Sequence, residues 1–286
     1  MANVKWQGDI STDPTVAGNW DTAAVPAAGE HVVFDGTATG NCAGGAIAAD
    51  IGSLTITDDC TINIGTSHAV PLAFTCTAGL VTDMGSGTRY LAPAAAARVV
   101  EMGSGTVDLD GADNVLLLIN APSATVTVGD DPWGANTCDF TTVIVEAGLD
   151  VVLKNVETAA DGVYTLHIRG GTVETWSGLV EARQTGGVWT HRMGAVTNMY
   201  LSGGECRYNA TETIGTKAYV YSGGKLNFTY AGSAVTVAAC EFRAGATSLD
   251  PWGRVTWTAA PEGHNCSVKD CTLDFGFHKK YTIAAI

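Results

Sequence analysis

Basic side chains are scarce in this sequence. Lysine and arginine together number 15, against 29 aspartates and glutamates, and the formal net charge is -14 at pH 7. Nucleic-acid-binding chains contact phosphates with clustered lysine and arginine, so this balance argues against a nucleic-acid partner. The deficit is uneven, because residues 1–150 hold 18 acidic and three basic residues, whereas residues 151–286 hold 11 and 12. We interpret the acidic half as an aid to solubility, with a basic partner as the alternative.

Long apolar runs are also absent. No run reaches the roughly 18 residues that a membrane-spanning helix needs, so we expect no membrane insertion. The first residues, 1–6, lack the apolar stretch of a signal peptide, which predicts synthesis in the cytoplasm without export. The eight cysteines form no paired C-x-x-C spacing, so a zinc site is not supported. Cys42, Cys60 and Cys76 are expected as small apolar core residues, and Cys266 and Cys271 as the pair that bonds if oxidation occurs.

Charged residues make up only 15% of the chain, whereas hydrophobic residues make up 46%. A chain with so much apolar surface to bury is not disordered. Its 35 glycines oppose helix, because each glycine costs a helix about 1 kcal/mol relative to alanine. The composition therefore predicts a protein of strands and turns.

Short repeats recur at a nearly fixed spacing. Residues 84–91 and 102–109 both begin Met-Gly-Ser-Gly-Thr, at an offset of 18 residues. Glycine pairs follow at 170–171, 186–187, 203–204 and 223–224, and Ala244-Gly245 continues the series. The residues that flank these pairs alternate between apolar and polar, which is typical of half-buried strands, and glycine pairs permit the positive φ of a sharp corner.

A unit of strand, glycine corner and strand, repeated every 16 to 21 residues, predicts an all-β parallel β-helix or β-solenoid. A β-sandwich or jelly roll is the alternative fold, since it also joins short strands by turns. The matching positions of the glycine pairs favour the solenoid. We expect an N-terminal capping or docking segment at residues 1–36, a solenoid body at 37–263 and a C-terminal tail at 264–286.

The N-terminal segment differs from the repeats. It reads Trp-Gln-Gly at residues 6–8, Asn-Trp at 19–20 and Val-Pro-Ala-Ala-Gly-Glu-His-Val-Val-Phe at 25–34. This resembles the segment that leads into the first coils of β-helical surface proteins, both autotransporter-type adhesins and phage surface proteins. Glu30 stands where that pattern has aspartate. Trp6, Trp20 and Phe34 are candidates either to cap the open end of the solenoid, the favoured interpretation, or to dock onto a partner.

The resemblance, read with the missing export signal, implies a virion structural protein of a bacteriophage. It implies a capsid decoration (cement) protein that stabilises the head by binding across capsomers, with the major capsid protein or another virion protein as partner. A receptor-binding fibre or spike is the alternative, and a homotrimer is expected by analogy. In this interpretation Lys279 and Lys280 of the tail are rim contacts with the partner. The repeated Asp-Pro-Trp-Gly at 131–134 and 250–253 predicts two loops that present Trp133 and Trp252 to a ligand such as a sugar.

The sequence offers no catalytic set. Glycoside hydrolysis needs two carboxylates on one face, but the pairs Asp58-Asp59 and Asp130-Asp131 are adjacent in sequence and are expected to be solvated or to point to opposite faces. The acidic run at 108–114 resembles a calcium loop only in composition and is expected to be a polar turn. His167 and His191 are expected at solvent-facing strand positions. We therefore expect no enzyme activity, no cofactor and no metal, with a polysaccharide-degrading enzyme as the least favoured alternative.

Overall fold

The computed structural model describes residues 2–129, 140–154, 165–264, 272–274 and 284–285. The chain divides into two compact units, Met1–Glu157 and Thr158–Ile286. Within the described residues the only helix is the short 3-10 turn η1 (Ala17–Asn19), and no helix there is long and apolar enough to cross a membrane. The predicted boundaries at residues 36 and 263 remain predictions.

In its described residues, the first unit contains η1 and eleven strands. The strands are β1 (Asn3–Lys5), β2 (His31–Phe34), β3 (Gly45–Asp50), β4 (Ser53–Ile56), β5 (Leu72–Thr75), β6 (Leu80–Asp83), β7 (Thr88–Ala94), β8 (Arg98–Glu101), β9 (Ser104–Leu109), β10 (Asn114–Val128) and β11 (Phe140–Leu153).

These strands pair in two parallel stacks. One runs β1–β2–β4–β6–β8 and the other β3–β5–β7–β9. The 15-residue strand β10 belongs to both stacks, because its residues 117–119 pair with β8 and its residues 123–128 pair with β9. The chain thus passes from one stack to the other in each coil, and each coil lies against the next.

The second unit contains the strands β12 (Thr165–Ile168), β13 (Thr172–Thr175), β14 (Leu179–Gln184), β15 (Val188–His191), β16 (Val196–Leu201), β17 (Glu205–Tyr208), β18 (Ile214–Val220), β19 (Lys225–Asn227), β20 (Val235–Val237), β21 (Cys240–Arg243), β22 (Thr247–Leu249), β23 (Val255–Trp257), β24 (Glu262–His264), β25 (Thr272–Asp274) and β26 (Ala284–Ala285).

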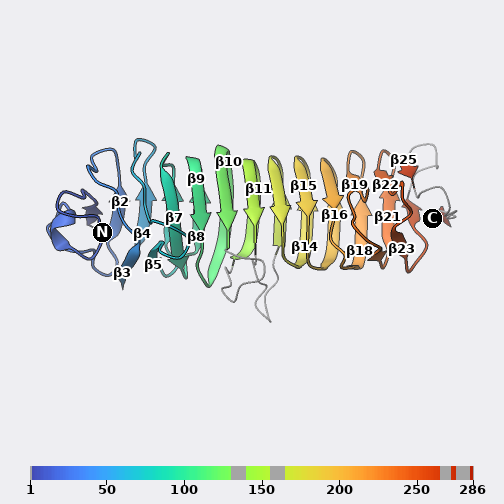
Figure 1. The fold of residues 1–286 in the computed structure, drawn as a ribbon. Coiled ribbons are helices and arrows are strands. Elements are labelled where there is room, and N and C mark those ends of the chain that lie inside the picture. Colours follow the sequence, from blue (N-terminus) through green and yellow to red (C-terminus); the bar gives the residue numbers. More distant parts are fainter. Residues whose placement is uncertain (1, 130–139, 155–164, 265–271, 275–283, 286) are drawn as a thin grey trace. The chain divides into compact units, whose positions relative to one another are not determined.

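Two parallel stacks also form most of the second unit, and β18, β20 and β23 form a further parallel run. One stack runs β12–β14–β16–β18–β21–β24 and the other β13–β15–β17–β19–β22–β25. Figure 1 shows the successive coils of this unit as neighbouring arrows. Every strand pairing in the described part of both units is parallel, so the predicted β-solenoid is confirmed and the β-sandwich alternative is wrong.

The register confirms the repeat length only in part. Thr172 pairs with Val188, sixteen residues on, and Asp83 pairs with Glu101, eighteen residues on, as the sequence repeats predict. Other coils exceed the predicted 16 to 21 residues. Asn3 pairs with His31, an interval of 28, because the long N-terminal loop is inserted between β1 and β2.

Glycine corners hold the coils of the second unit in register. Gly171, Gly187 and Gly204 have φ of 76°, 69° and 73°, the left-handed region that glycine adopts without strain. The backbone N–H of Val188 donates to Gly171 O at 2.9 Å, and that of Glu205 donates to Gly187 O at 3.0 Å. A Cβ on Gly187 would lie 2.4 Å from Gly171 O, so the close stacking of the corners requires glycine as well.

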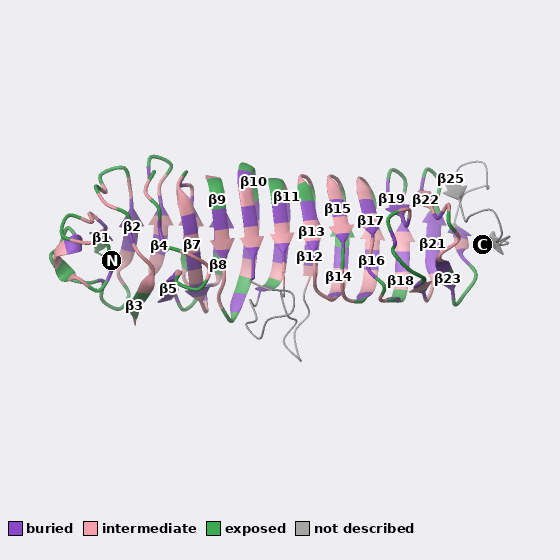
Figure 2. Ribbon diagram, in the orientation of Figure 1, coloured by how far each residue is buried: buried purple, intermediate pink, exposed green. Residues whose placement is uncertain are grey.

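The interior of each coil is lined by alternate strand residues. Figure 2 shows this alternation of buried and half-buried positions along the strands. Cys42, Cys60 and Cys76 are buried free cysteines, which confirms their expected core position, but Cys42 aligns with Ile64 rather than with another cysteine. Burial raises the pKa of the Cys60 thiol to about 11.

A polar network lies inside the second unit. His191 on β15 is fully buried, so the expectation of a solvent-facing position is wrong. Its Nε2 lies 2.6 Å from Gly194 O, which accepts only, so Nε2 carries the proton. Its Nδ1 then accepts from the Thr175 hydroxyl at 2.8 Å, and that hydroxyl accepts from Trp189 Nε1 at 2.9 Å. The neutral imidazole therefore satisfies every partner, and burial lowers its pKa to about 4.

Candidate functional site

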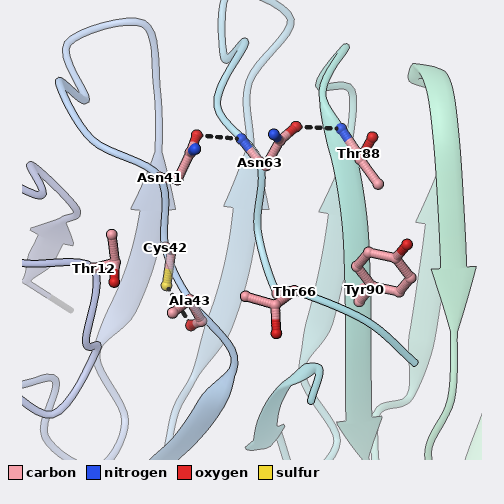
Figure 3. A pocket seen from close by; sticks show the side chains of 9 residues that line it. Thr12, Asn41, Cys42, Ala43, Asn63, Thr66, Thr88 and Tyr90 are labelled. Atoms are coloured by element: carbon pink, nitrogen blue, oxygen red, sulfur yellow. Dashed lines mark hydrogen bonds between the residues drawn. The ribbon is translucent and has the colours of Figure 1, made fainter. Parts of the chain in front are cut away.

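A groove of about 410 Å³ lies on the outside of the first unit. It is built on three aligned core residues, since Cys42 bridges Ile64 and Ile64 bridges Arg89 in parallel register. Strand side chains alternate between faces, so the residues on either side of these three point outward and line the groove. The lining residues are Thr12, Asn41, Cys42, Ala43, Asn63, Gly65, Thr66, Thr88 and Tyr90. We call this the polar groove (Figure 3).

Two asparagines line one side of the polar groove in fixed orientation. The backbone N–H of Asn63 donates to Asn41 Oδ1 at 2.9 Å, and that of Thr88 donates to Asn63 Oδ1 at 2.9 Å (Figure 3). A backbone N–H needs an acceptor, so the oxygen of each amide faces the next coil. The exposed Nδ2 groups of Asn41 and Asn63 donate to no other described residue. They are therefore the amide atoms that a ligand meets.

The other side of the polar groove is formed by Gly65 and Tyr90. Tyr90 N donates to Ile64 O at 2.7 Å, and Gly65 N donates to Cys42 O at 2.9 Å, which fixes both in the stack. Gly65 has φ of 73°, and a Cβ there would lie 2.7 Å from the Cβ of Tyr90. The half-buried ring of Tyr90 makes no aromatic or cation–π contact with any described residue. The ring is therefore a groove wall rather than part of an aromatic cluster.

The described residues that line the polar groove are all uncharged: none is acidic or basic. Burial raises the pKa of the Cys42 thiol to about 12, so that group is neutral and unreactive at physiological pH. Thr12 forms the rim, because its carbonyl accepts from Ala43 N at 2.7 Å and ties the N-terminal loop to the coil. Chemically, the groove can donate and accept neutral hydrogen bonds.

A second ordered surface lies on the outside of the second unit. Tyr200 on β16 and Tyr219 on β18 are paired in register, and their rings stack at 4.9 Å with an interplanar angle of 2°. Tyr221 extends the row, with its ring centroid 6.4 Å from that of Tyr219. Arg183, Lys217 and Arg243 each lie 5.0 Å from the centre of one of these rings. We call these six residues the tyrosine ladder.

Each cation of the tyrosine ladder is also paired with glutamate. Arg183 lies 2.7 Å from Glu181, Lys217 lies 3.0 Å from Glu262, and both Lys217 and Arg243 contact Glu241. The face is consequently balanced in charge. Since the ring faces are covered by neighbouring rings and cations, the ring edges and the hydroxyls are what the ladder offers to a partner.

A buried ion cluster lies inside the first unit. Arg89 Nε lies 2.6 Å from Asp83 Oδ2, and Arg89 Nη2 lies 3.5 Å from Glu101 Oε1, with all three side chains at most 1% exposed. Backbone N–H groups of Gly85 and Gly103 donate to Asp83 and Glu101 at 2.9 and 2.7 Å. Burial, together with the charge of Asp83, raises the pKa of Glu101. These carboxylates are therefore enclosed in the interior of the coils.

The predicted docking residues of the N-terminal segment lie inside the fold. Trp6, Trp20 and Phe34 are fully buried and pack against one another, with ring centroids 5.1 to 6.1 Å apart. The indole N–H groups donate to Gly40 O and Pro14 O, both at 2.9 Å. This burial corrects the docking alternative, because none of the three side chains is on the surface. The capping interpretation is compatible with it.

The remaining predicted residues divide between the surface and the undescribed part of the chain. Trp252 is 65% exposed. Its turn is fixed by the buried Asp250, whose carboxylate accepts from Arg254 N at 2.8 Å and from Val255 N at 3.0 Å. Trp133, Lys279 and Lys280, together with Cys266, Cys271 and the pair at 130–131, lie outside the described residues.

The acidic run at 108–114 is engaged with a histidine. His68 Nδ1 lies 2.9 Å from Asp108 Oδ1, and His68 Nε2 lies 3.6 Å from Asp110 Oδ2. The part of the chain that the structure describes holds no group of three or more histidine, cysteine, aspartate or glutamate side chains suited to a metal ion. Asp58 and Asp59 lie in an exposed turn.

Comparison with known proteins gives no match: no protein-family model, no curated protein and no solved structure is similar to this chain.

Proposed function

We propose that this chain is a structural protein of a bacteriophage virion, a capsid decoration protein that stabilises the head by binding across capsomers. The N-terminal pattern of Trp6, Trp20 and Phe34 supports the proposal by its resemblance to phage surface proteins. The β-solenoid supports it physically, because coils locked by continuous hydrogen-bonded stacks resist deformation. In this proposal the chain assembles on the capsid surface as a homotrimer and performs no catalysis.

The tyrosine ladder is the observation that carries the docking part of the proposal. Tyrosine and arginine are enriched at the energetic centres of protein interfaces. The hydroxyls of Tyr200, Tyr219 and Tyr221 donate to no described residue, so they are free to bond to a partner. The balanced ion pairs around them form a polar rim that suits a protein surface without strong charge. We assign this face to contact with the major capsid protein or another virion protein.

A reconstitution experiment tests this assignment. Particles stripped of the protein are incubated with purified wild type and with the double variant Tyr200→Ala/Tyr219→Ala, and bound protein is quantified. Loss of two interface tyrosines is expected to weaken binding at least about tenfold, because hot-spot residues each contribute about 2 kcal/mol or more. The matched control is Tyr230→Ala, which removes an exposed tyrosine that also stacks with an arginine but lies outside the ladder.

A conservative variant separates docking from folding. Tyr200→Phe/Tyr219→Phe keeps the stacked rings and removes only the two hydroxyls, so the stability of the second unit is expected to change little while binding weakens. If wild type fails to bind the particles, the decoration proposal is wrong. If the ladder variants bind like the Tyr230→Ala control, the docking face lies elsewhere.

A receptor-binding fibre or adhesin is the second candidate function, and the exposed Trp252 favours it. A tryptophan held outward by a fixed turn is suited to stacking on a sugar ring. This candidate predicts a glycan-array signal that Trp252→Ala abolishes. An identical signal from wild type and variant contradicts it.

A further inference from the structure

We propose that the polar groove of the first unit is a binding site for an uncharged oligosaccharide chain that lies along the stacking direction of the coils. The inference goes beyond the proposed function, since decoration of a capsid needs no ligand. It also uses a different unit of the chain from the tyrosine ladder and Trp252.

The lining of the polar groove has the chemistry that sugar hydroxyls require. The Nδ2 groups of Asn41 and Asn63 donate hydrogen bonds, and the hydroxyls of the lining threonines both donate and accept. The ring of Tyr90 provides an apolar surface for the C–H groups of a pyranose. The volume of about 410 Å³ lies within the range of about 300–1,000 Å³ that small-ligand sites occupy.

The donors are held in place before a ligand arrives. Asn41 Oδ1 and Asn63 Oδ1 each accept a backbone N–H from the following coil, which fixes the direction of the free Nδ2. Binding therefore costs little side-chain entropy. The two amides belong to successive coils, whose separation of about 4.8 Å is comparable to the length of one hexose unit. Repeated donors at this spacing suit a repeated ligand.

The uncharged, polar lining of the groove argues against other classes of ligand. Because no lysine, arginine or carboxylate is among the described lining residues, they offer no ion-pair partner for a phosphate or an acidic sugar and no ligand set for a divalent cation. Its polar threonines and asparagines also disfavour an apolar chain such as a lipid tail, because those donors would lose hydrogen bonds to water without replacement.

The test is binding of the full chain to an array of neutral and acidic oligosaccharides, followed by calorimetry on the strongest binder. The deciding variant is Asn63→Asp. It keeps an oxygen to accept from Thr88 N, so the coil stays paired, but it replaces the free amide donor with a charged acceptor. Asn120→Asp is the matched control, because Asn120 is exposed on β10 of the same unit and does not line the groove.

We expect a neutral oligosaccharide to bind to wild type and to Asn120→Asp with affinities within twofold of each other, and Asn63→Asp to bind at least about tenfold more weakly. A shift of the side-chain amide NMR signals of Asn41 and Asn63 when the oligosaccharide is added would locate the ligand in the groove. The proposal is overturned if only acidic sugars bind, if no sugar binds, or if binding is lost in Trp252→Ala and retained in Asn63→Asp.

Discussion

Protonation of His191 provides the sharpest test of the solenoid interior. The pKa of this buried imidazole is lowered from 6.5 to about 4, chiefly by burial. A lowered pKa means that the unfolded chain binds the proton more tightly, so the contribution to stability is complete above pH 6.5 and is lost as the pH falls towards 4. Linkage then gives a loss of roughly 2 kcal/mol in the free energy of unfolding between pH 8 and pH 5 from this residue alone.

The measurement compares wild type with His191→Gln by urea denaturation at both pH values. At pH 8 the variant is expected to be less stable by about 1–3 kcal/mol, because Thr175 or Gly194 loses a buried partner. At pH 5 the difference in the free energy of unfolding between wild type and variant should shrink by roughly 2 kcal/mol, since only wild type loses stability through the lowered pKa of His191. His167→Gln is the matched control on a half-buried outer position and should show a smaller change with pH. A gap that is equal at the two pH values, or an imidazole NMR titration near pH 6.5, would refute the burial argument.

Three further predictions concern the coil stacks. Gly187→Ala should destabilise the second unit by more than about 1 kcal/mol in chemical denaturation, because φ is 69° and the new Cβ meets a carbonyl at 2.4 Å, whereas Gly232→Ala meets nothing within 4 Å and should be nearly neutral. Arg89→Met should cost about 3–5 kcal/mol, because Asp83 is left charged and buried; a loss below about 1 kcal/mol would contradict the ion cluster. Glu101→Gln should remove the fall in stability that wild type shows as the pH rises above the usual pKa of glutamate, since the folded pKa is raised.

The architecture was predictable from the sequence where the repeats are regular. The glycine pairs at 170–171, 186–187 and 203–204 mark corners because a positive φ and the closeness of the neighbouring coil both require glycine. The repeat at 84–91 and 102–109 gives the true register of β7 on β9. Both signals are local, since each depends on backbone geometry that a few residues determine.

The polar groove was not predictable by the same route. Asn41 and Asn63 are 22 residues apart, and Asn63 and Thr88 are 25 apart, intervals that a search for coils of 16 to 21 residues does not align. Loops inserted in these coils set the intervals, and loop length leaves no periodic signal. The signal that was present is the recurrence of asparagine and threonine before the buried positions 42, 64 and 89.

Buried polar residues were the other group that the sequence misplaced. His191 comes two residues after Trp189 on β15, so both side chains point to the inner face. That spacing indicated burial of His191, but its polar character favoured a surface position. For Trp6 and Trp20, docking stayed open as the alternative to the favoured capping interpretation, because their partners, Phe34 and the carbonyls of Gly40 and Pro14, come together only in the folded chain. Such long-range contacts are not encoded in local pattern.

The most direct test of the proposed role is the copy number of this chain in purified virus particles, measured by quantitative mass spectrometry against the major capsid protein. A decoration protein that binds across capsomers is predicted at hundreds of copies per particle. A few copies per particle would contradict decoration and favour a fibre, and absence from the particles would contradict the virion assignment altogether.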